Sequence, residues 1–312
     1  MAPARDEFEL IDWIARLAGR APRPPEVRVA IGDDAAVLRL APGEEFVVST
    51  DAAVEGVHFR RDRMAAATAG RRAVAAALSD LAAMGAVPRG LLLAAASPAA
   101  RRSWLEGMLR GALAAARRHR CPVVGGNLSR AGEISLTSTA VGSVPRGRAL
   151  RRDTARPGDR ILVTGTLGRS ALALLRSERR GAPLRQVPQP RLRAGRALLG
   201  LRGAGACIDV SDGLAADLGH LLRASGVGAR VDPAALPRPR GFERACAELG
   251  ADPLALLVGG GEDFELLFTL RPGAPSPGVL RHRLGVEVTE IGTMERRPGL
   301  RGLPGELGFR HF

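Results

Sequence analysis

Five short acidic segments interrupt the apolar stretches of this chain. Each comes where the spacing of apolar residues is typical of a strand or helix that is ending, so carboxylates stand at the margins of the predicted cores. Such a position is costly unless a cation or hydrogen-bond donors meet the carboxylate. The segments therefore predict either solvated turns or cation sites. They are Asp33–Asp34, Asp51, Asp80, the pair Asp209 and Asp212, and Glu262–Asp263.

Helical and strand patterns alternate in both halves of the chain. This alternation predicts the α/β (α+β) fold class, and 312 residues are enough for two domains, which we place at 1–150 and 151–312. We predict helices over residues 7–18, 64–85 and 98–119, and strands over 27–38, 44–59, 88–97, 121–127 and 134–144. Beyond the polar stretch 151–159 we predict a strand and glycine turn at 161–168, a strand–turn–helix at 206–225, a strand pair at 254–270 and a strand at 286–294.

All 46 basic residues are arginine, because the chain contains no lysine. A Walker A loop, a Schiff-base enzyme and a protein-kinase core each need a lysine, so these three classes are excluded. Any phosphate chemistry here must use metal ions, arginine and backbone N–H groups.

The net charge of +14 is compatible with binding to nucleic acid, but the arginines are spread over every segment and only 3% of residues are aromatic. We therefore expect no nucleic-acid partner. No stretch approaches the roughly 18 apolar residues of a membrane span, and the N-terminus lacks the apolar core of a signal peptide. We expect a cytoplasmic protein with no membrane partner. Three scattered cysteines predict neither a disulfide framework nor a zinc site.

Two of the acidic segments have competing interpretations. Asp80 has Ala76, Ala77, Ala83 and Met84 as its helical neighbours, so it is either a ligand at an apolar face or an exposed residue of an alanine-rich helix. Asp212 opens a helix, where it is either a helix cap or part of an anion or Mg²⁺ site. Oxygen ligands of this kind suit Mg²⁺, whereas the few histidines form no zinc-hydrolase motif.

Nine motifs, in this order, resemble those of the thiamine-monophosphate kinase family and extend over residues 31 to 312. This family belongs with aminoimidazole ribonucleotide synthetase and selenophosphate synthetase, which use ATP without a P-loop. The motifs are GDDAAVL, STDAAVEGVHF, LSDLAAMGAVP, GGNLSR, PRGRALRRDTARPGD, VTGTLG, IDVSDGLAADLGHL, GGGEDFELLF and GFRHF.

The resemblance implies ATP- and Mg²⁺-dependent phosphorylation of thiamine monophosphate to thiamine diphosphate, by direct transfer. It implies two α/β domains of the aminoimidazole ribonucleotide synthetase type: an N-terminal domain that binds ATP and Mg²⁺ and shares its sheet across a homodimer, and a C-terminal domain that completes the active-site cleft.

The resemblance also assigns roles to individual residues. Gly126, Arg152 and Ser211 would contact ATP, and His58, Glu262 and Phe309 would face the thiamine substrate. Asn127 stands where the family pattern usually has aspartate, so it offers a carbonyl oxygen without a charge. Several Mg²⁺ ions per site would be bound by Asp34, Ser49, Thr50, Asp51, Asp80, Asn127, Asp209 and Asp212.

Two alternatives stay open at this point. Aminoimidazole ribonucleotide synthetase itself uses ATP, Mg²⁺ and the same architecture, and a basic nucleic-acid-binding protein would use the acidic segments only as turns. Selenophosphate synthetase is disfavoured because the first cysteine is Cys121 and lysine is absent, and the hydrogenase-maturation relative is disfavoured because the chain ends without a cysteine.

Overall fold

The computed structural model describes residues 7–19 and 24–303, which form two compact units. The N-terminal unit comprises Met1–Leu78 and Pro88–Arg146, and the C-terminal unit comprises Ser79–Val87 and Gly147–Phe312. The mixed α/β class predicted from the sequence is confirmed. Within the described ranges, no helix is long and apolar enough to cross a membrane.

The N-terminal unit is built on a four-stranded sheet with the order β3-β6-β4-β5. β3 pairs with β6 in antiparallel fashion, and β4 with β5 in parallel. A short antiparallel hairpin of β1 and β2 precedes the sheet. The elements are α1 (Glu7–Ala18), β1 (Val27–Val29), β2 (Val37–Leu38), β3 (Glu44–Val54), α2 (Ala66–Ala83), β4 (Val87–Ser97), η1 (Ala99–Arg101), α3 (Arg102–Arg118), β5 (Val123–Arg130) and β6 (Ser135–Pro145).

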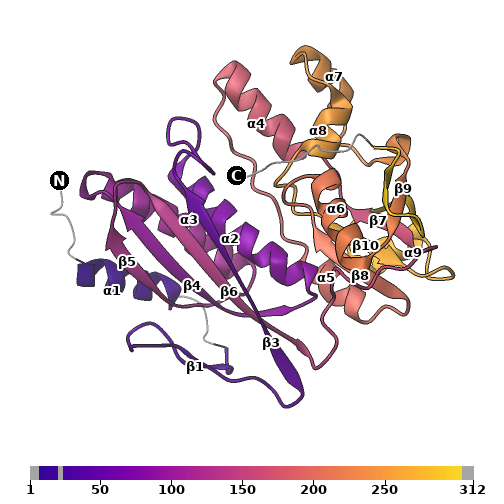
Figure 1. The fold of residues 1–312 in the computed structure, drawn as a ribbon. Coiled ribbons are helices and arrows are strands. Elements are labelled where there is room, and N and C mark those ends of the chain that lie inside the picture. The colour runs from indigo at the N-terminus through magenta and orange to yellow at the C-terminus, as the bar shows by residue number, and fades with distance from the viewer. Residues whose placement is uncertain (1–6, 20–23, 304–312) are drawn as a thin grey trace. The chain divides into compact units, whose positions relative to one another are not determined.

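Helices α2 and α3 lie side by side against this sheet (Figure 1). They approach so closely that a Cβ added at Gly111 of α3 would lie 2.0 Å from the carbonyl oxygen of Ala67, and one at Gly70 of α2 would lie 1.8 Å from that of Met108. Only glycine allows this backbone contact. It brings the alanine-rich helix down onto the buried side of β4 and β6.

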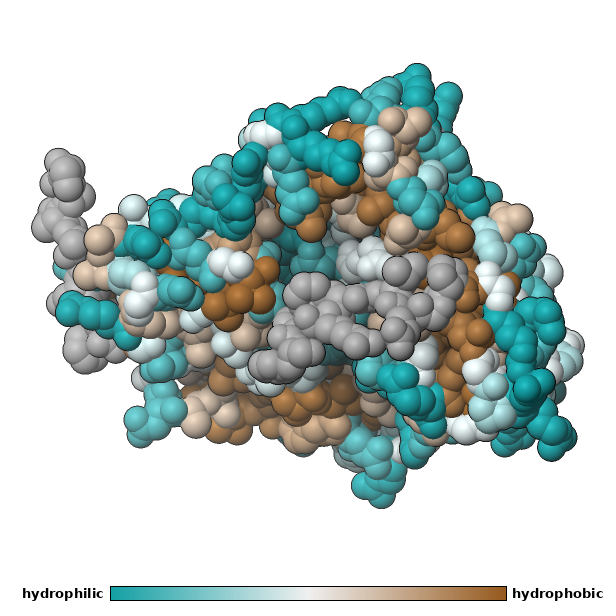
Figure 2. Space-filling model, turned by 45° about the horizontal axis from the view of Figure 1, so that its top comes forward, coloured by the Kyte–Doolittle hydropathy of each residue, from teal (hydrophilic) through white to brown (hydrophobic). Residues whose placement is uncertain are grey.

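Among the described residues of the N-terminal unit, the other face of the sheet is exposed along β3. Along β3 the alternate residues Phe46 and Val48 are 54% and 61% exposed, although both are apolar. They continue into Thr50 and Ala52 on the same face. Figure 2 shows hydrophobic and hydrophilic areas interleaved on one side of the molecular surface. An apolar sheet face without a covering helix is typical of a surface that binds another protein surface.

The C-terminal unit contains a six-stranded sheet with the order β12-β9-β11-β7-β10-β8. Its pairs are antiparallel except for β12 with β9. The elements are β7 (Arg160–Thr164), α4 (Arg169–Arg180), α5 (Leu192–Leu199), β8 (Ala204–Asp209), α6 (Leu214–Ser225), β9 (Gly228–Val231), η2 (Pro233–Ala235), α7 (Phe242–Glu248), α8 (Pro253–Gly259), β10 (Leu266–Leu270), α9 (Pro277–Leu284), β11 (Val288–Glu295) and β12 (Gly299–Arg301).

Helices cover both faces of this sheet. Alternate residues of one strand show it: Ile161 and Val163 of β7 pack with α6, α7 and α8, whereas Leu162 packs with α5, α9 and the last turn of α2. A Cβ at Gly195 of α5 would lie 1.9 Å from the carbonyl oxygen of Ala82, so α5 and the end of α2 touch through their backbones. This contact fixes the end of α2, which carries Asp80, within the C-terminal unit.

Four predicted segments differ most from the structure, and one of them is the strand expected over 44–59, which ends at Val54. The strand pair expected over 254–270 is wrong in its first half, where α8 forms because Asp252 caps the helix, its side chain accepting from Leu254 N–H at 3.0 Å, and Pro253 stands at the first helical position. The strand expected over 27–38 is split into β1 and β2. The strand expected to end at residue 127 continues to Arg130.

The backbone contact between α2 and α3 generates a stability prediction. Gly111→Ala should lower the unfolding free energy by about 1–3 kcal/mol, because the added methyl group has no space, although alanine is the better helix former. Gly132→Ala is the control, since nothing lies within 4 Å of a Cβ at Gly132. Urea unfolding of both variants measures the difference, and a Gly111→Ala protein as stable as the control would contradict the packing.

Candidate active site

A short turn between β8 and α6 is the centre of the acidic site in the C-terminal unit. β8 ends at Asp209, which is 2% exposed, and the turn continues through Ser211 and Asp212 to Gly213. Gly213 has φ +112°, and a Cβ there would lie 2.9 Å from the carbonyl oxygen of Gly259. The turn can therefore approach the 259–265 loop only because residue 213 is glycine.

Asp217, at the start of α6, binds the backbone of the β8–α6 turn. One of its carboxylate oxygens, Oδ2, accepts from the backbone N–H groups of Ser211 at 2.9 Å and Asp212 at 3.0 Å. Asp217 is itself 2% exposed. The N-cap residue of α6 is Gly213, which has no side-chain cap, so the cap interpretation of Asp212 is wrong; Asp217 instead binds the turn that precedes the helix.

The side chain of Asp209 accepts a hydrogen bond from a residue 130 positions earlier in the chain. The hydroxyl of Ser79 in α2 donates to Asp209 Oδ2 at 2.6 Å, and its neighbour Asp80 is half-buried. The structure therefore brings Asp80 and Asp209 into the same acidic group, as the resemblance implied. The exposed Arg152 is the cation whose charge acts on Asp209.

These carboxylates disfavour one another's ionisation. Burial and then the charge of Asp80 raise the pKa of Asp209 to about 6, although Ser79 and Arg152 act in the opposite direction. Burial and then the charges of Asp209 and Asp212 raise the pKa of Asp217 to about 7, against the two backbone hydrogen bonds. Both pKa values lie far above the ordinary value for aspartate. Negative charge on these two side chains is therefore unfavourable at these positions.

The donor set fits Mg²⁺. Carboxylate oxygens are its preferred protein ligands, and a divalent cation would offset both the burial and, secondarily, the mutual repulsion that raise the two pKa values. In the described part of the chain, no three Asp, Glu, His or Cys side chains already form a group that could hold a metal ion. Mg²⁺ can be bound by one or two carboxylates, with water and substrate phosphates completing its shell.

The acidic loop 259–265 lies directly against the β8–α6 turn. Glu262 donates its N–H to the carbonyl oxygen of Ser211 at 2.7 Å, so the predicted substrate residue is adjacent to a predicted ATP residue. Asp263 is 6% exposed and accepts from the N–H groups of Gly168 at 2.6 Å and Ser170 at 2.9 Å. Burial raises the pKa of Asp263 to about 6, against these hydrogen bonds.

In the N-terminal unit, the predicted ligands of β3 do not share one face. The register pairs Asp51 with Ser138 and Thr50 with Thr139, and residues that pair across a sheet point to the same side. Asp51 and Ser49 therefore face the helix-covered side with buried Ser138. Thr50 faces the open side, where its Oγ1 lies 3.0 Å from that of Thr139.

Gly126 and Asn127 lie inside β5, not at a strand end. A Cβ at Gly126 would lie 2.0 Å from the carbonyl oxygen of Leu93, so only glycine fits there, and Asn127 is exposed beside Ala94. β6 and β4 separate β5 from β3, a distance of about 14 Å at the usual strand spacing. Asn127 and Asp51 of one unit therefore cannot bind the same Mg²⁺ ion.

Two more predicted residues of this unit lie in loops. Asp34 is exposed between β1 and β2, and its N–H donates to Asp33 Oδ1 at 2.9 Å. His58 follows β3, and its Nδ1 accepts from Val54 N–H at 3.1 Å, so the neutral ring carries its proton on Nε2. Phe309 lies outside the described residues.

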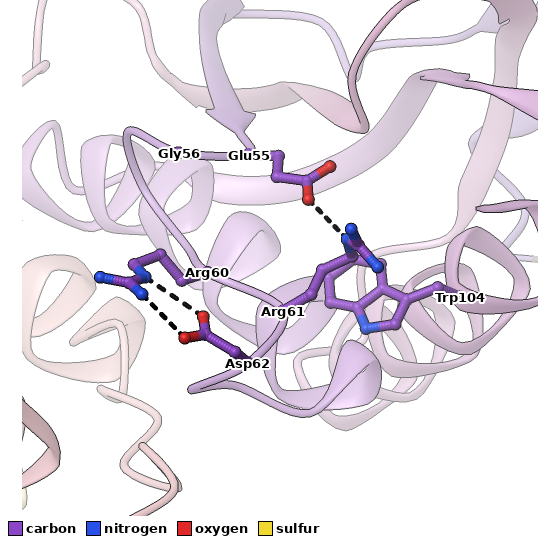
Figure 3. A pocket seen from close by; sticks show the side chains of 6 residues that line it. All are labelled: Glu55, Gly56, Arg60, Arg61, Asp62 and Trp104. Carbon is purple, nitrogen blue, oxygen red and sulfur yellow. Dashed lines mark hydrogen bonds and ion pairs between the residues drawn. The ribbon is translucent and has the colours of Figure 1, made fainter. Parts of the chain in front are cut away.

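A pocket of about 520 Å³ opens beside the loop that carries His58 (Figure 3). Glu55, which lines the pocket, binds two arginines. Arg61 Nε donates to Glu55 Oε1 at 2.5 Å, and Arg101 Nη1 donates to Glu55 Oε2 at 2.9 Å. Burial raises the pKa of Glu55, but its hydrogen bonds, first that of Arg61, outweigh burial and keep the pKa below its ordinary value. Trp104 lines the pocket and stacks on Phe59 with ring centroids 5.0 Å apart.

Sequence reasoning missed Asp217 and Ser79. Asp217 had a partial signal, because Leu214 and Leu221, three positions before it and four after it, are apolar, which is the kind of argument that singled out Asp80. Ser79 had none, because its partner Asp209 lies 130 positions away.

Comparisons with known proteins show what this chain is similar to. The family model "AIR synthase related protein, N-terminal domain" matches residues 32–144, and the corresponding C-terminal domain model matches residues 156–302. The chain is 39% identical over 305 residues to a thiamine-monophosphate kinase of Synechococcus elongatus, covering 90% of this chain and 91% of the relative.

Solved structures are similar as well. A crystal structure of thiamine-monophosphate kinase from Stenotrophomonas maltophilia has a TM-score of 0.81 and 38% identity, covering 96% of this chain and 97% of that one. A structure of AaThiL complexed with AMPPCP and TMP has a TM-score of 0.76 and 30% identity, with all of both chains covered.

The raised pKa of Asp217 generates a pH prediction. Since about 7 lies above the ordinary 3.8, the folded state binds this proton more tightly than the unfolded state does. The stability that this proton contributes is present at low pH and lost as the pH rises towards 7. In Asp217→Asn that loss should be absent, because the asparagine oxygen can accept both N–H groups without a charge.

Urea unfolding from pH 5 to 8 with a chelator present measures this. The unfolding free energy of the unsubstituted protein should fall with pH more steeply than that of the variant, by up to about 1.4 kcal/mol per pH unit. Asp232→Asn is the control, because Asp232 is an exposed cap that accepts from Ala234 N–H at 2.9 Å. Equal slopes for the unsubstituted protein and Asp217→Asn would contradict the raised pKa.

Proposed function

On the premise that this chain belongs to the thiamine-monophosphate kinase family of AIR synthase related proteins, we propose that it phosphorylates thiamine monophosphate with ATP to give thiamine diphosphate. The observation that carries the proposal is the match over all of both chains to AaThiL complexed with AMPPCP, an ATP analogue, and TMP. Relatives of the same name from several bacteria, at 33–40% identity over most of the chain, support it.

Mg²⁺ is the cofactor that we propose for this reaction. Asp209, Asp212 and Asp80 would hold it in the C-terminal unit, and Asp34, Asp51, the oxygens of Ser49 and Thr50, and the Asn127 carbonyl would hold further ions. Bound Mg²⁺ neutralises charge on the phosphates of ATP. The raised pKa values of Asp209 and Asp217 support a cation at this place.

The chain's own residues then have three tasks. Arg152, Ser211 and Gly126 would bind the nucleotide. His58, Glu262 and Phe309 orient the thiamine substrate. Asp217 holds the acidic turn through hydrogen bonds to two of its backbone N–H groups.

No residue needs to act as a general base. The attacking atom is a phosphate oxygen of thiamine monophosphate, which is already ionised at neutral pH. One bond forms from this oxygen to the γ-phosphorus of ATP, and the bond from that phosphorus to the β-phosphate oxygen breaks, leaving ADP. The task is to bring two anions together in line, which positioning and charge neutralisation accomplish. This explains a site rich in aspartate and arginine and poor in histidine.

We propose that the functional form is a homodimer, in the cytoplasm, with the N-terminal sheet as the dimer surface and the two predicted domains contributing to one reaction. The exposed apolar row of Phe46 and Val48 on β3 supports the dimer. β3 is also an edge strand of its sheet.

The proposed function is tested by which compound accepts the phosphoryl group of ATP. Turnover with ATP should be fast for thiamine monophosphate and absent for free thiamine and for formylglycinamidine ribonucleotide, the substrate of aminoimidazole ribonucleotide synthetase. Asp212→Asn should abolish most of this activity and leave the melting temperature nearly unchanged, because Asp217 maintains the turn. Equal turnover of free thiamine, or full activity of Asp212→Asn at low Mg²⁺, would contradict the proposal.

The dimer surface can be tested separately. The unsubstituted protein should sediment as a dimer at micromolar concentration, and Val48→Glu should sediment as a monomer because a charge replaces a buried apolar contact. Val279→Glu is the matched control, since Val279 is 45% exposed on α9 of the C-terminal unit. A monomeric unsubstituted protein, or a dimeric Val48→Glu, would contradict the proposed surface.

A further inference from the structure

We infer that Asp263 is a positioning residue, which acts on the thiamine substrate through Glu262 by fixing the backbone of the 259–265 loop. The inference rests on the proposed function, in which Glu262 contacts thiamine monophosphate. It concerns a residue that lies next to a predicted substrate residue and is itself turned into the protein.

Asp263 caps the N-terminus of α4 in place of a side chain from the N-cap residue. Gly168 is the N-cap residue of this helix and has no side chain to cap it. Asp263 instead accepts from Gly168 N–H through one oxygen, at 2.6 Å, and from Ser170 N–H through the other, at 2.9 Å. The carboxylate comes from a position 95 residues further along the chain. It ties the loop to the first turn of a 12-residue helix.

The backbone of Glu262 is held from both sides. Its N–H donates to Ser211 at 2.7 Å, and its carbonyl oxygen accepts from the hydroxyl of Ser170 at 2.7 Å. Next in the loop, Phe264 N–H donates to the carbonyl oxygen of Val210 at 2.9 Å. Ser170 thus joins the helix that Asp263 caps to the residue that would face the substrate.

The loop stores backbone strain at this place. Glu262 has φ +60° and Phe264 has φ +51°, a left-handed conformation that costs roughly 1–2 kcal/mol for a residue with a side chain. The chain has three consecutive glycines just before Glu262, yet neither strained position is a glycine. A strained residue that is not glycine, next to a predicted site, indicates that its side chain is needed there.

Asp263 does not itself reach a substrate. It is 6% exposed, and each of its oxygens accepts a backbone N–H. Its contribution is therefore to hold the left-handed loop in place, so that the side chain of Glu262 is delivered beside the β8–α6 turn.

Steady-state kinetics of Asp263→Asn tests this role. Asparagine can accept only one of the two N–H groups, and the loop should loosen. The KM for thiamine monophosphate should rise about fivefold or more, and the KM for ATP should change less than about twofold. Ser170→Ala, which removes only the bond to the Glu262 carbonyl, should shift the same KM in the same direction by a smaller factor.

Two further variants separate positioning from general destabilisation. Asp159→Asn is the matched control: Asp159 is 1% exposed, accepts Arg156 N–H at 2.8 Å, and lies at the opposite end of the sheet from the loop, next to the Arg160–Leu270 pair. It should lower the melting temperature and leave both KM values unchanged. In a Glu262→Ala background, Asp263→Asn should raise the KM for thiamine monophosphate by less than about twofold further, because its effect passes through Glu262.

An equal KM for thiamine monophosphate in Asp263→Asn and Asp159→Asn would overturn the inference, as would an undiminished effect of Asp263→Asn without Glu262. If the unsubstituted protein does not phosphorylate thiamine monophosphate, the proposed function fails. The positioning is then measured by hydrogen exchange. Asp263→Asn should accelerate exchange about tenfold or more in peptides covering 259–265 relative to Asp159→Asn. Unchanged exchange there would overturn the positioning role on its own.

Discussion

The constraint on which the C-terminal unit depends is the burial of like charges at the end of β8. Asp209 and Asp217 are each 2% exposed, and their charges, with those of Asp80 and Asp212, oppose one another's ionisation. A fold keeps such an arrangement only if donors or a cation compensate it. Here the donors are few: the hydroxyl of Ser79 and two backbone N–H groups. Under the proposed function, a cation would compensate the remaining charge at this turn.

Close backbone packing connects the β8–α6 turn to the 259–265 loop and, through this loop, to α4. The β8–α6 turn touches the 259–265 loop through Gly213 and through the hydrogen bond between Glu262 and Ser211. That loop caps α4 through Asp263. Three motifs that are far apart in the sequence therefore have one shared geometry, and a change in one of them alters the position of the others.

The sequence predicted whatever depends on local spacing. The alternation of strands and helices follows from patterns within short windows, and the family follows from the ordered motifs; that Asp80 and Asp209 share one acidic group was implied only by the resemblance. α8 was not predicted because the apolar residues before the three glycines were interpreted as a strand that ends in a turn. The helix start at Asp252 and Pro253 was overlooked. The contacts of Ser79 and Asp263 could not be predicted, because they join residues 130 and 95 positions apart. The opposite facing of Thr50 and Asp51 follows from strand alternation alone and was available from the sequence.

The central claim is that the end of β8 binds a divalent cation. Crystals grown with Mn²⁺ and a non-hydrolysable ATP analogue would test it through the anomalous scattering of manganese. The account predicts a peak within about 2.5 Å of a carboxylate oxygen of Asp209 or Asp212, with Asp217 still bound to the backbone of the turn. Manganese found only elsewhere in the protein, with the nucleotide bound, would contradict it.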